Sequence, residues 1–249
     1  MVSSGRKDAA LNPGEIDILN DLRVALEASK AVPPRSIELV VRIVSNWDYA
    51  DRLAGLDLLR CMARQHTVAQ FSDSQFPSLI HLTVSSSLPA TGDVKPNENA
   101  VMMGIRIIAN IFATADGRSL ASSQADTALS FLSKVAGVQP GPAPIGKFNR
   151  NILIAASTAA LNYAVLVSRE RLLTPQLRQR LFSIIGAILA DQTDSEILYR
   201  GLVALGTLLS ASRDAAASLD VKGWIRGAAE RGSDDRILEV ANETSRILG

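Results

Sequence analysis

The chain has 249 residues, with 26 Lys and Arg against 25 Asp and Glu and a formal net charge of +1. This balance gives no bulk attraction for nucleic acid or for an anionic membrane, so recognition by charge requires a local cluster. Hydrophobic residues make up 47% of the chain and aromatic residues only 4%, which predicts an aliphatic interior of packed helices. The single cysteine, Cys61, excludes an intramolecular disulfide and a zinc site of several thiolates. A reducing compartment, the cytoplasm or the nucleus, is therefore the expected location.

The first residues differ in composition from the rest of the chain. Residues 1–12 are small and polar and are predicted to be a disordered lead, whereas residues 13–249 are predicted to form one elongated domain. No charged start is followed by an apolar segment, and no uninterrupted apolar run is long enough to cross a bilayer. We therefore expect no contact with a membrane.

Helix signals recur along the whole chain. Asn12, Pro13 and Glu15 form a helix start, because proline suits the first turn and an acid there complements the helix dipole. The periodicity of apolar residues and the breaks between them predict helices near residues 15–28, 35–47, 50–65, 73–87, 97–114, 122–136, 150–168, 174–191, 194–211, 214–230 and 234–248. The short segment ADGRS is predicted to be a turn, and no sustained alternation indicates a strand.

Four apolar segments resemble one another in length and pattern: LAGLDLLRCMAR, NENAVMMGIRIIANIF, ILIAASTAALNYAVLV and LYRGLVALGTLL. Their best common register aligns Arg60, Asn110, Asn162 and Gly206, at separations of 50, 52 and 44 residues. Such loose spacing is typical of a helical-repeat array. The sequence predicts an all-α, armadillo-like solenoid that is curved and has a concave groove lined by one helix of each repeat.

One string has the spacing of a phosphate-binding loop. Residues 141–147, GPAPIGK, match Gly-x-x-x-x-Gly-Lys, but Pro142 and Pro144 have no N–H to offer a phosphate. Phe148 stands where the motif requires Ser or Thr, and no strand precedes the string. We therefore expect no nucleotide site.

Other chemistry has little support. His66 and His81 lie 15 residues apart without further ligands at metal-binding spacing, and no nucleophile elbow of the form Gly-x-Ser-x-Gly occurs. Cys61 is expected to be a buried, inert residue. The sequence predicts a protein with no metal, no cofactor and no catalytic activity.

A set of polar residues lies on the most apolar helices of the repeats, where a purely structural design favours Ala or Leu. An arginine there must keep its guanidinium in water or pair it. The alternative is that these are ordinary solvated positions of amphipathic helices. Tyr163 is considered as an aromatic anchor in the groove. The candidate peptide-binding residues are Arg60, Arg200, Arg106, Asn110, Asn162 and Tyr163.

Several runs resemble the PUL domain, the C-terminal module of the WD-repeat ubiquitin-binding family known as phospholipase-activating protein. The resemblance extends from Glu15 to Leu248, and the loop GVQPGPAPIGKF departs from the shorter family form. Its most specific parts are Leu161-Asn162-Tyr163 and RGLVALGTL at residues 200–208. It is carried by NILIAASTAALNYAVLV, ILYRGLVALGTLLS, SNWDYADRLAGLDLLRCMARQHTVAQF and NENAVMMGIRIIANIF.

This resemblance implies an adaptor whose positively charged concave face binds the C-terminal tail of valosin-containing protein, a hexameric AAA+ ATPase. It implies a role in ubiquitin-dependent protein turnover and ubiquitin homeostasis, with ubiquitin itself bound only by domains absent from this sequence. By position, Arg60 and Arg200 match the basic groove residues, and Arg106 and Asn162 match less closely. A monomer is expected.

Two other functions stand as alternatives. A self-associating scaffold would fill its groove with its own terminus or with another copy, which light scattering would detect. A hydrolase with dispersed catalytic residues would show turnover that one substitution abolishes, although the sequence pairs no nucleophile with a base.

Overall fold

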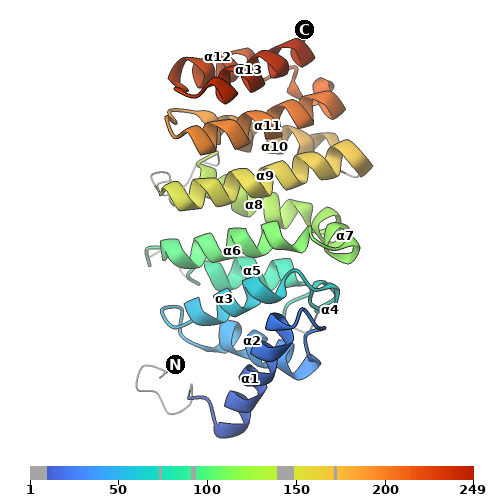
Figure 1. Cartoon of the computed structure of the whole chain (residues 1–249), viewed down its shortest axis with the longest axis vertical. Helices are drawn as coiled ribbons and strands as arrows, with labels where there is room; N and C mark the ends of the chain where they lie inside the picture. The colour runs from blue at the N-terminus through green and yellow to red at the C-terminus, as the bar shows by residue number, and fades with distance from the viewer. Residues whose placement is uncertain (1–9, 73–74, 91–93, 139–148, 171–172) are drawn as a thin grey trace. The chain divides into compact units, whose positions relative to one another are not determined.

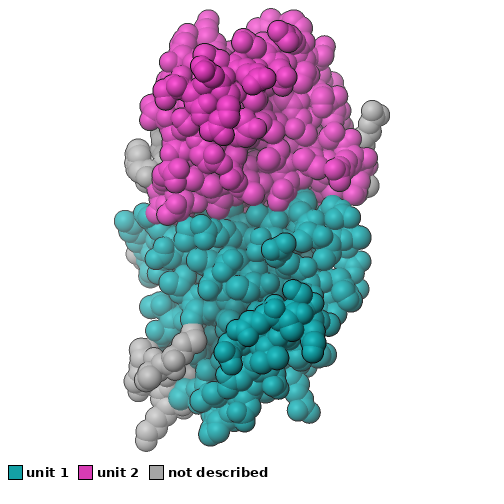
Figure 2. Space-filling view, viewed as in Figure 1, with its two compact units in different colours: residues 1–121 teal, residues 122–249 magenta. Residues whose placement is uncertain are grey.

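The computed structural model describes residues 10–72, 75–90, 94–138, 149–170 and 173–249 (Figure 1). Within these ranges the chain contains helices and no strand, which confirms the predicted all-α, helical-repeat class. The chain divides into two compact units, unit 1 at residues 1–121 and unit 2 at residues 122–249 (Figure 2). The phosphate-loop-like string at 141–147 and most of the predicted lead lie outside the described residues. The single domain over 13–249, the curvature and the basic groove stay predictions.

Unit 1 is built from two layers of helices. Helices α3 and α6 pack side by side; α2 packs against α3 and α5, and α5 packs against α6 and α3. Between them lie aliphatic side chains with no exposed surface, including Val40, Leu56, Leu59, Ile105 and Ile108. The helices are α1 (Pro13–Glu27), α2 (Pro34–Asn46), α3 (Leu53–Met62), α4 (His66–Ala69), α5 (Leu79–Ser87), α6 (Glu98–Ile111) and α7 (Ala115–Ser123), the last of which crosses into unit 2.

Unit 2 repeats this design. Helices α9, α11 and α13 pack side by side in one layer, and α8, α10 and α12 form the second layer (Figure 1). Helix α10 contacts both α9 and α11 and so joins the layers. The elements are α8 (Ala125–Ala136), α9 (Arg150–Glu170), α10 (Pro175–Leu189), α11 (Ser195–Ser212), the 3₁₀ helix η2 (Arg213–Ala216), α12 (Val221–Arg231) and α13 (Asp235–Leu248).

The predicted start of the first helix is confirmed in detail. The backbone N–H of Glu15 donates to Asn12 Oδ1 at 3.0 Å, and the backbone N–H of Asn12 donates to Glu15 Oε2 at 2.9 Å. This capping box satisfies donors that the first turn leaves without partners. Pro13, at the first position, has no N–H to satisfy.

Two helix predictions were wrong in their boundaries, and one turn was predicted where the structure has a helix. The helix predicted from residue 73 begins at Leu79, because the side chain of Ser78 caps it by accepting from the N–H of His81. The predicted ADGRS turn lies within α7. The helix predicted over 214–230 is divided into η2 and α12, and Asp220 caps α12 by accepting from the N–H of Gly223. Capping residues therefore mark helix ends that the periodicity of apolar residues does not reveal.

Helix α9 meets the length and composition criteria for a membrane span. It has 21 residues, but 61% of its most apolar window is buried inside the fold. Ile152, Ala156 and Leu166 are among its buried residues. Such burial is typical of the core helix of a repeat unit.

Candidate peptide-binding site

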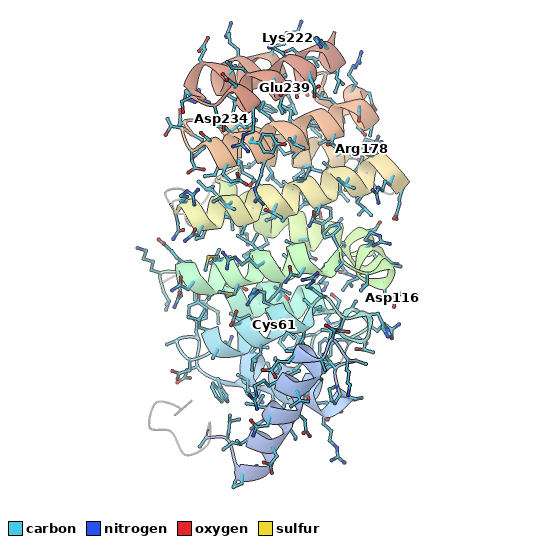
Figure 3. The ribbon with its side chains drawn as sticks, viewed as in Figure 1. Cys61, Asp116, Arg178, Lys222, Asp234 and Glu239 are labelled. Atoms are coloured by element: carbon cyan, nitrogen blue, oxygen red, sulfur yellow. The ribbon has the colours of Figure 1, made fainter. Side chains whose placement is uncertain are left out.

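Arg60 lies in the last turn of α3, in unit 1. Its Nε donates to Asp57 Oδ1 at 2.8 Å, one turn earlier on the same helix, and its side chain is 31% exposed. The hydrogen bond with Asp57 raises the pKa of the Arg60 guanidinium, and partial burial opposes this effect. A weak contact of 3.5 Å joins the guanidinium to Cys61 Sγ, which is half-buried rather than buried as predicted (Figure 3 labels Cys61). The guanidinium is therefore oriented, paired and still accessible.

Asn110 joins the two neighbouring helices of this layer. Its Nδ2 donates to the backbone carbonyl of Arg60 at 2.9 Å. The register that aligns Arg60 with Asn110 therefore places these two residues in direct contact. Arg106 lies one turn before Asn110 on α6 and hence on the same face, and its side chain is half-buried. Asn110 has a structural role in addition to any contact with a ligand.

Arg200 has an equivalent environment in unit 2. Its Nε donates to Glu196 Oε1 at 2.6 Å within α11, and its Nη1 donates to Thr158 Oγ1 of α9, also at 2.6 Å. The side chains of Arg200 and Glu196 are 34% and 36% exposed, so solvent screens this ion pair and its net contribution to stability is at most about 1 kcal/mol. As in unit 1, a polar side chain connects adjacent helices of one layer and leaves a guanidinium partly open to solvent.

Asn162 lies one turn after Thr158 on α9 and is half-buried, so it shares the face of α9 that Arg200 contacts. Tyr163 does not. Its side chain has no exposed surface, and burial raises the pKa of its hydroxyl group. Successive residues of an α-helix point about 100° apart, so when Asn162 lies at the edge of the layer its neighbour points into the core. This burial argues against a role of Tyr163 as an anchor in the groove.

Further ionic and cation–π contacts in unit 2 were not predicted from the sequence. Arg150 Nε donates to Asp194 Oδ2 at 2.6 Å, which connects the start of α9 to the cap of α11. Arg236 donates through Nη2 to Asp234 Oδ2 at 2.6 Å, and its guanidinium carbon lies 5.4 Å from the centre of the Tyr199 ring on α11. Nothing in the sequence around these residues indicated the contacts, because each depends on the packing of neighbouring helices.

These contacts determine the electrostatics of unit 2. Burial raises the pKa of Asp194, but hydrogen bonds from Arg150 and from the backbone of Ile197 outweigh it and the net pKa is lowered. Hydrogen bonds from Arg236 lower the pKa of Asp234. Arg150, Arg200 and Arg236 are each paired with a carboxylate, so they do not form a simple basic patch. A ligand carboxylate must share an arginine with its present partner or displace that partner.

No group of three or more His, Cys, Asp or Glu residues has metal-binding geometry in the described part of the chain. The guanidinium groups of Arg60 and Arg200 are hydrogen-bond donors, which suits them to binding a carboxylate.

Two layers of stacked helices with polar connections between repeats define a helical-repeat protein. The family model described as PUL domain matches residues 1–243, and the chain belongs to the PUL domain family. This confirms the family predicted from the sequence.

Curated relatives agree with this assignment. The chain is 26% identical over 233 residues to the ubiquitin homeostasis protein lub1 of Schizosaccharomyces pombe, covering 90% of this chain and 30% of the relative. It is 28% identical over 214 residues to the phospholipase A-2-activating protein of Xenopus laevis, covering 82% of this chain and 24% of the relative. The chain thus spans less than a third of the length of either relative.

Proposed function

We propose that this chain is an adaptor module that binds the C-terminal tail of valosin-containing protein in ubiquitin-dependent protein turnover and ubiquitin homeostasis. Membership of the PUL domain family and the name of the fission-yeast relative support the ubiquitin-related part. In this proposal, ubiquitin itself is bound by domains outside this sequence. The proposed setting is the cytoplasm and the nucleus, and the proposed activity is binding rather than catalysis.

The observation that carries the tail-binding proposal is the environment of Arg200. A guanidinium has five N–H donors, and Arg200 uses two of them, toward Glu196 and Thr158. Within the described ranges the remaining donors have no other partner, and we propose that they and the exposed third of the side chain bind a carboxylate of the tail. Glu196 and Thr158 fix the rotamer in advance, which reduces the entropy lost on binding.

Arg60 supplies a second site of the same kind. Asp57 orients its guanidinium, and the side chain remains 31% exposed. Charge-assisted hydrogen bonds contribute about 1.5–3 kcal/mol each, so two or three fit the roughly 8 kcal/mol of a micromolar complex after ordering costs. Arg106 and Asn162, which lie on the faces that carry these contacts, are proposed to bind the peptide backbone or further side chains.

The test is a titration of the chain with a fluorescently labelled peptide of the ATPase tail, followed by anisotropy. The same peptide without its terminal residues serves as the matched control. Saturable binding of the full tail and loss of binding by the shortened tail support the proposal. Equal affinity for the two peptides, or no binding of either, contradicts it.

A further inference from the structure

A second candidate binding surface lies between α12 and α13 in unit 2 and shares no residue with the peptide-binding site. It is a groove with a volume of about 440 Å³, whose floor includes Ile225, Ala229 and Ala241. Lys222 and Arg226, one turn apart on α12, lie along one side (Figure 3 labels Lys222). Among the residues that the structure describes, no acidic side chain lines the groove.

The two cations of this groove are not paired with acidic side chains. Lys222 and Arg226 are exposed, and neither forms an ion pair with another residue in the described ranges. This distinguishes them from Arg150, Arg200 and Arg236, which are paired with carboxylates. An apolar floor beside two unpaired cations matches a helix that presents apolar residues flanked by acids.

Helix α1 in unit 1 has such a face. Ile16 and Val24 are 48% and 53% exposed, at a spacing that places them on one side of the helix. Asp17, Asp21 and Glu27, also exposed, lie beside them, and the exposed Arg23 of the same side pairs with Glu27 at 3.9 Å, so acids are in excess. The opposite side of α1 is occupied, because Leu22 and Ala25 are buried and α1 packs there on α2. The exposed face is thus apolar and acidic, whereas the α12–α13 groove is apolar and basic.

We propose that the α12–α13 groove binds the exposed α1 face of a second copy of this chain. The α1 face has a net negative charge and the groove a net positive one, so neither is complementary to itself, and the contact joins two different surfaces of the two copies. Such a heterologous contact leaves one groove and one α1 face unoccupied in every pair, so it extends to further copies unless a ring closes.

Sedimentation equilibrium at chain concentrations up to about 1 mM tests the proposal, because small and polar contacts are populated in this range. The apparent mass of the wild-type chain is expected to rise above 26.6 kDa with concentration, and the rise is expected to weaken at high salt. A mass that stays at the monomer value throughout overturns the proposal.

Charge reversal identifies the two surfaces. The groove variant Lys222→Glu/Arg226→Glu and the α1 variant Asp17→Lys/Asp21→Lys are each expected to stay monomeric. An equimolar mixture is expected to assemble, because each changed surface then meets its complement on the other variant. Misfolding cannot produce this recovery, and circular dichroism confirms that both variants remain helical. Assembly of either variant alone, or no assembly of the mixture, contradicts the proposed contact.

Both variants keep every residue of the peptide-binding site. Their affinity for the ATPase tail peptide is expected to equal that of the wild-type chain, so failure of the self-association proposal is separate from failure of the proposed function. A lowered tail affinity in the groove variant would assign the groove to the tail and contradict its assignment to α1.

Discussion

The backbone carbonyl of Arg60 accepts a hydrogen bond of 2.9 Å from Asn110 Nδ2 of the next repeat. Arg60 lies in the last turn of α3, where a carbonyl has no partner within its own helix. The side chain of Asn110, on α6, therefore caps the C-terminal end of α3 and holds the two helices together. The same residue whose guanidinium is proposed to bind a ligand is held in place through its main chain.

The first prediction concerns this contact. Asn110→Asp keeps the size of the side chain but removes its donor and places a charge beside a carbonyl oxygen. The free energy of unfolding is expected to fall by about 1–3 kcal/mol, measured by urea denaturation. Asn99→Asp, at an exposed position of the same helix, is the control and is expected to change it by less than about 0.5 kcal/mol. Equal effects would show that the contact between repeats does not stabilise the fold.

A second prediction concerns the packing of α10 against α12. A Cβ atom at Gly186 would lie 2.4 Å from the ring of Trp224, so the two helices approach only because position 186 has no side chain. Gly186→Ala is expected to lower the melting temperature and to cost about 1–3 kcal/mol. Gly14→Ala, whose Cβ would lie 3.4 Å from Asn12, is expected to be neutral or slightly stabilising. A neutral Gly186→Ala variant would contradict the close approach.

A third prediction follows from the burial of Tyr163. Because the side chain has no exposed surface, its hydroxyl group does not contact a ligand. Tyr163→Phe is expected to bind the ATPase tail peptide within about twofold of the wild-type affinity, a difference below about 0.5 kcal/mol. A large loss of affinity in a variant of unchanged helical content would restore Tyr163 as a groove residue.

The fourth prediction concerns pH. Asp194 caps α11 and pairs with Arg150, and its folded-state pKa lies below the ordinary value of 3.8. A depressed pKa contributes stability that is complete above the unfolded value and is lost as pH falls through the folded value. Wild-type stability should therefore decline below about pH 3.8 partly through this group.

Asp194→Asn isolates this contribution. Asparagine caps a helix about as well as aspartate but does not titrate or pair with Arg150. The variant is expected to be less stable than the wild-type chain near neutral pH and to approach it at low pH. Urea denaturation across the pH range measures the difference, and a constant difference would contradict the assignment.

The sequence was sufficient for the fold class, the family and most helices, because apolar periodicity and breaks are local signals. It was insufficient where the packing of neighbouring helices decides which residues are buried. Asn162 and Tyr163 are adjacent in sequence, yet one is half-buried and the other lies in the core. Only the packing of α9 against its neighbours selects between them.

The ionic contacts were missed for the same reason. Arg236 meets Tyr199 only because α13 packs beside α11, and Arg150 meets Asp194 only because α9 does. Their separations along the chain contain no motif that predicts these pairs. The sequence predicted a basic surface. In the structure, Arg60 and Arg200 are oriented by, and paired with, the carboxylates of Asp57 and Glu196.

The most direct test of the proposed function is the affinity of the double variant Arg60→Ala/Arg200→Ala for the labelled ATPase tail. The control is Arg180→Ala, because Arg180 on α10 is 33% exposed and paired with Asp126, much as Arg200 is 34% exposed and paired with Glu196. Because the double variant cannot form two charge-assisted hydrogen bonds to the tail, it is expected to bind at least about 100-fold more weakly at unchanged helical content. The control is expected to bind like the wild-type chain. Wild-type affinity in the double variant, or an equal decrease in double variant and control, would contradict the proposed function.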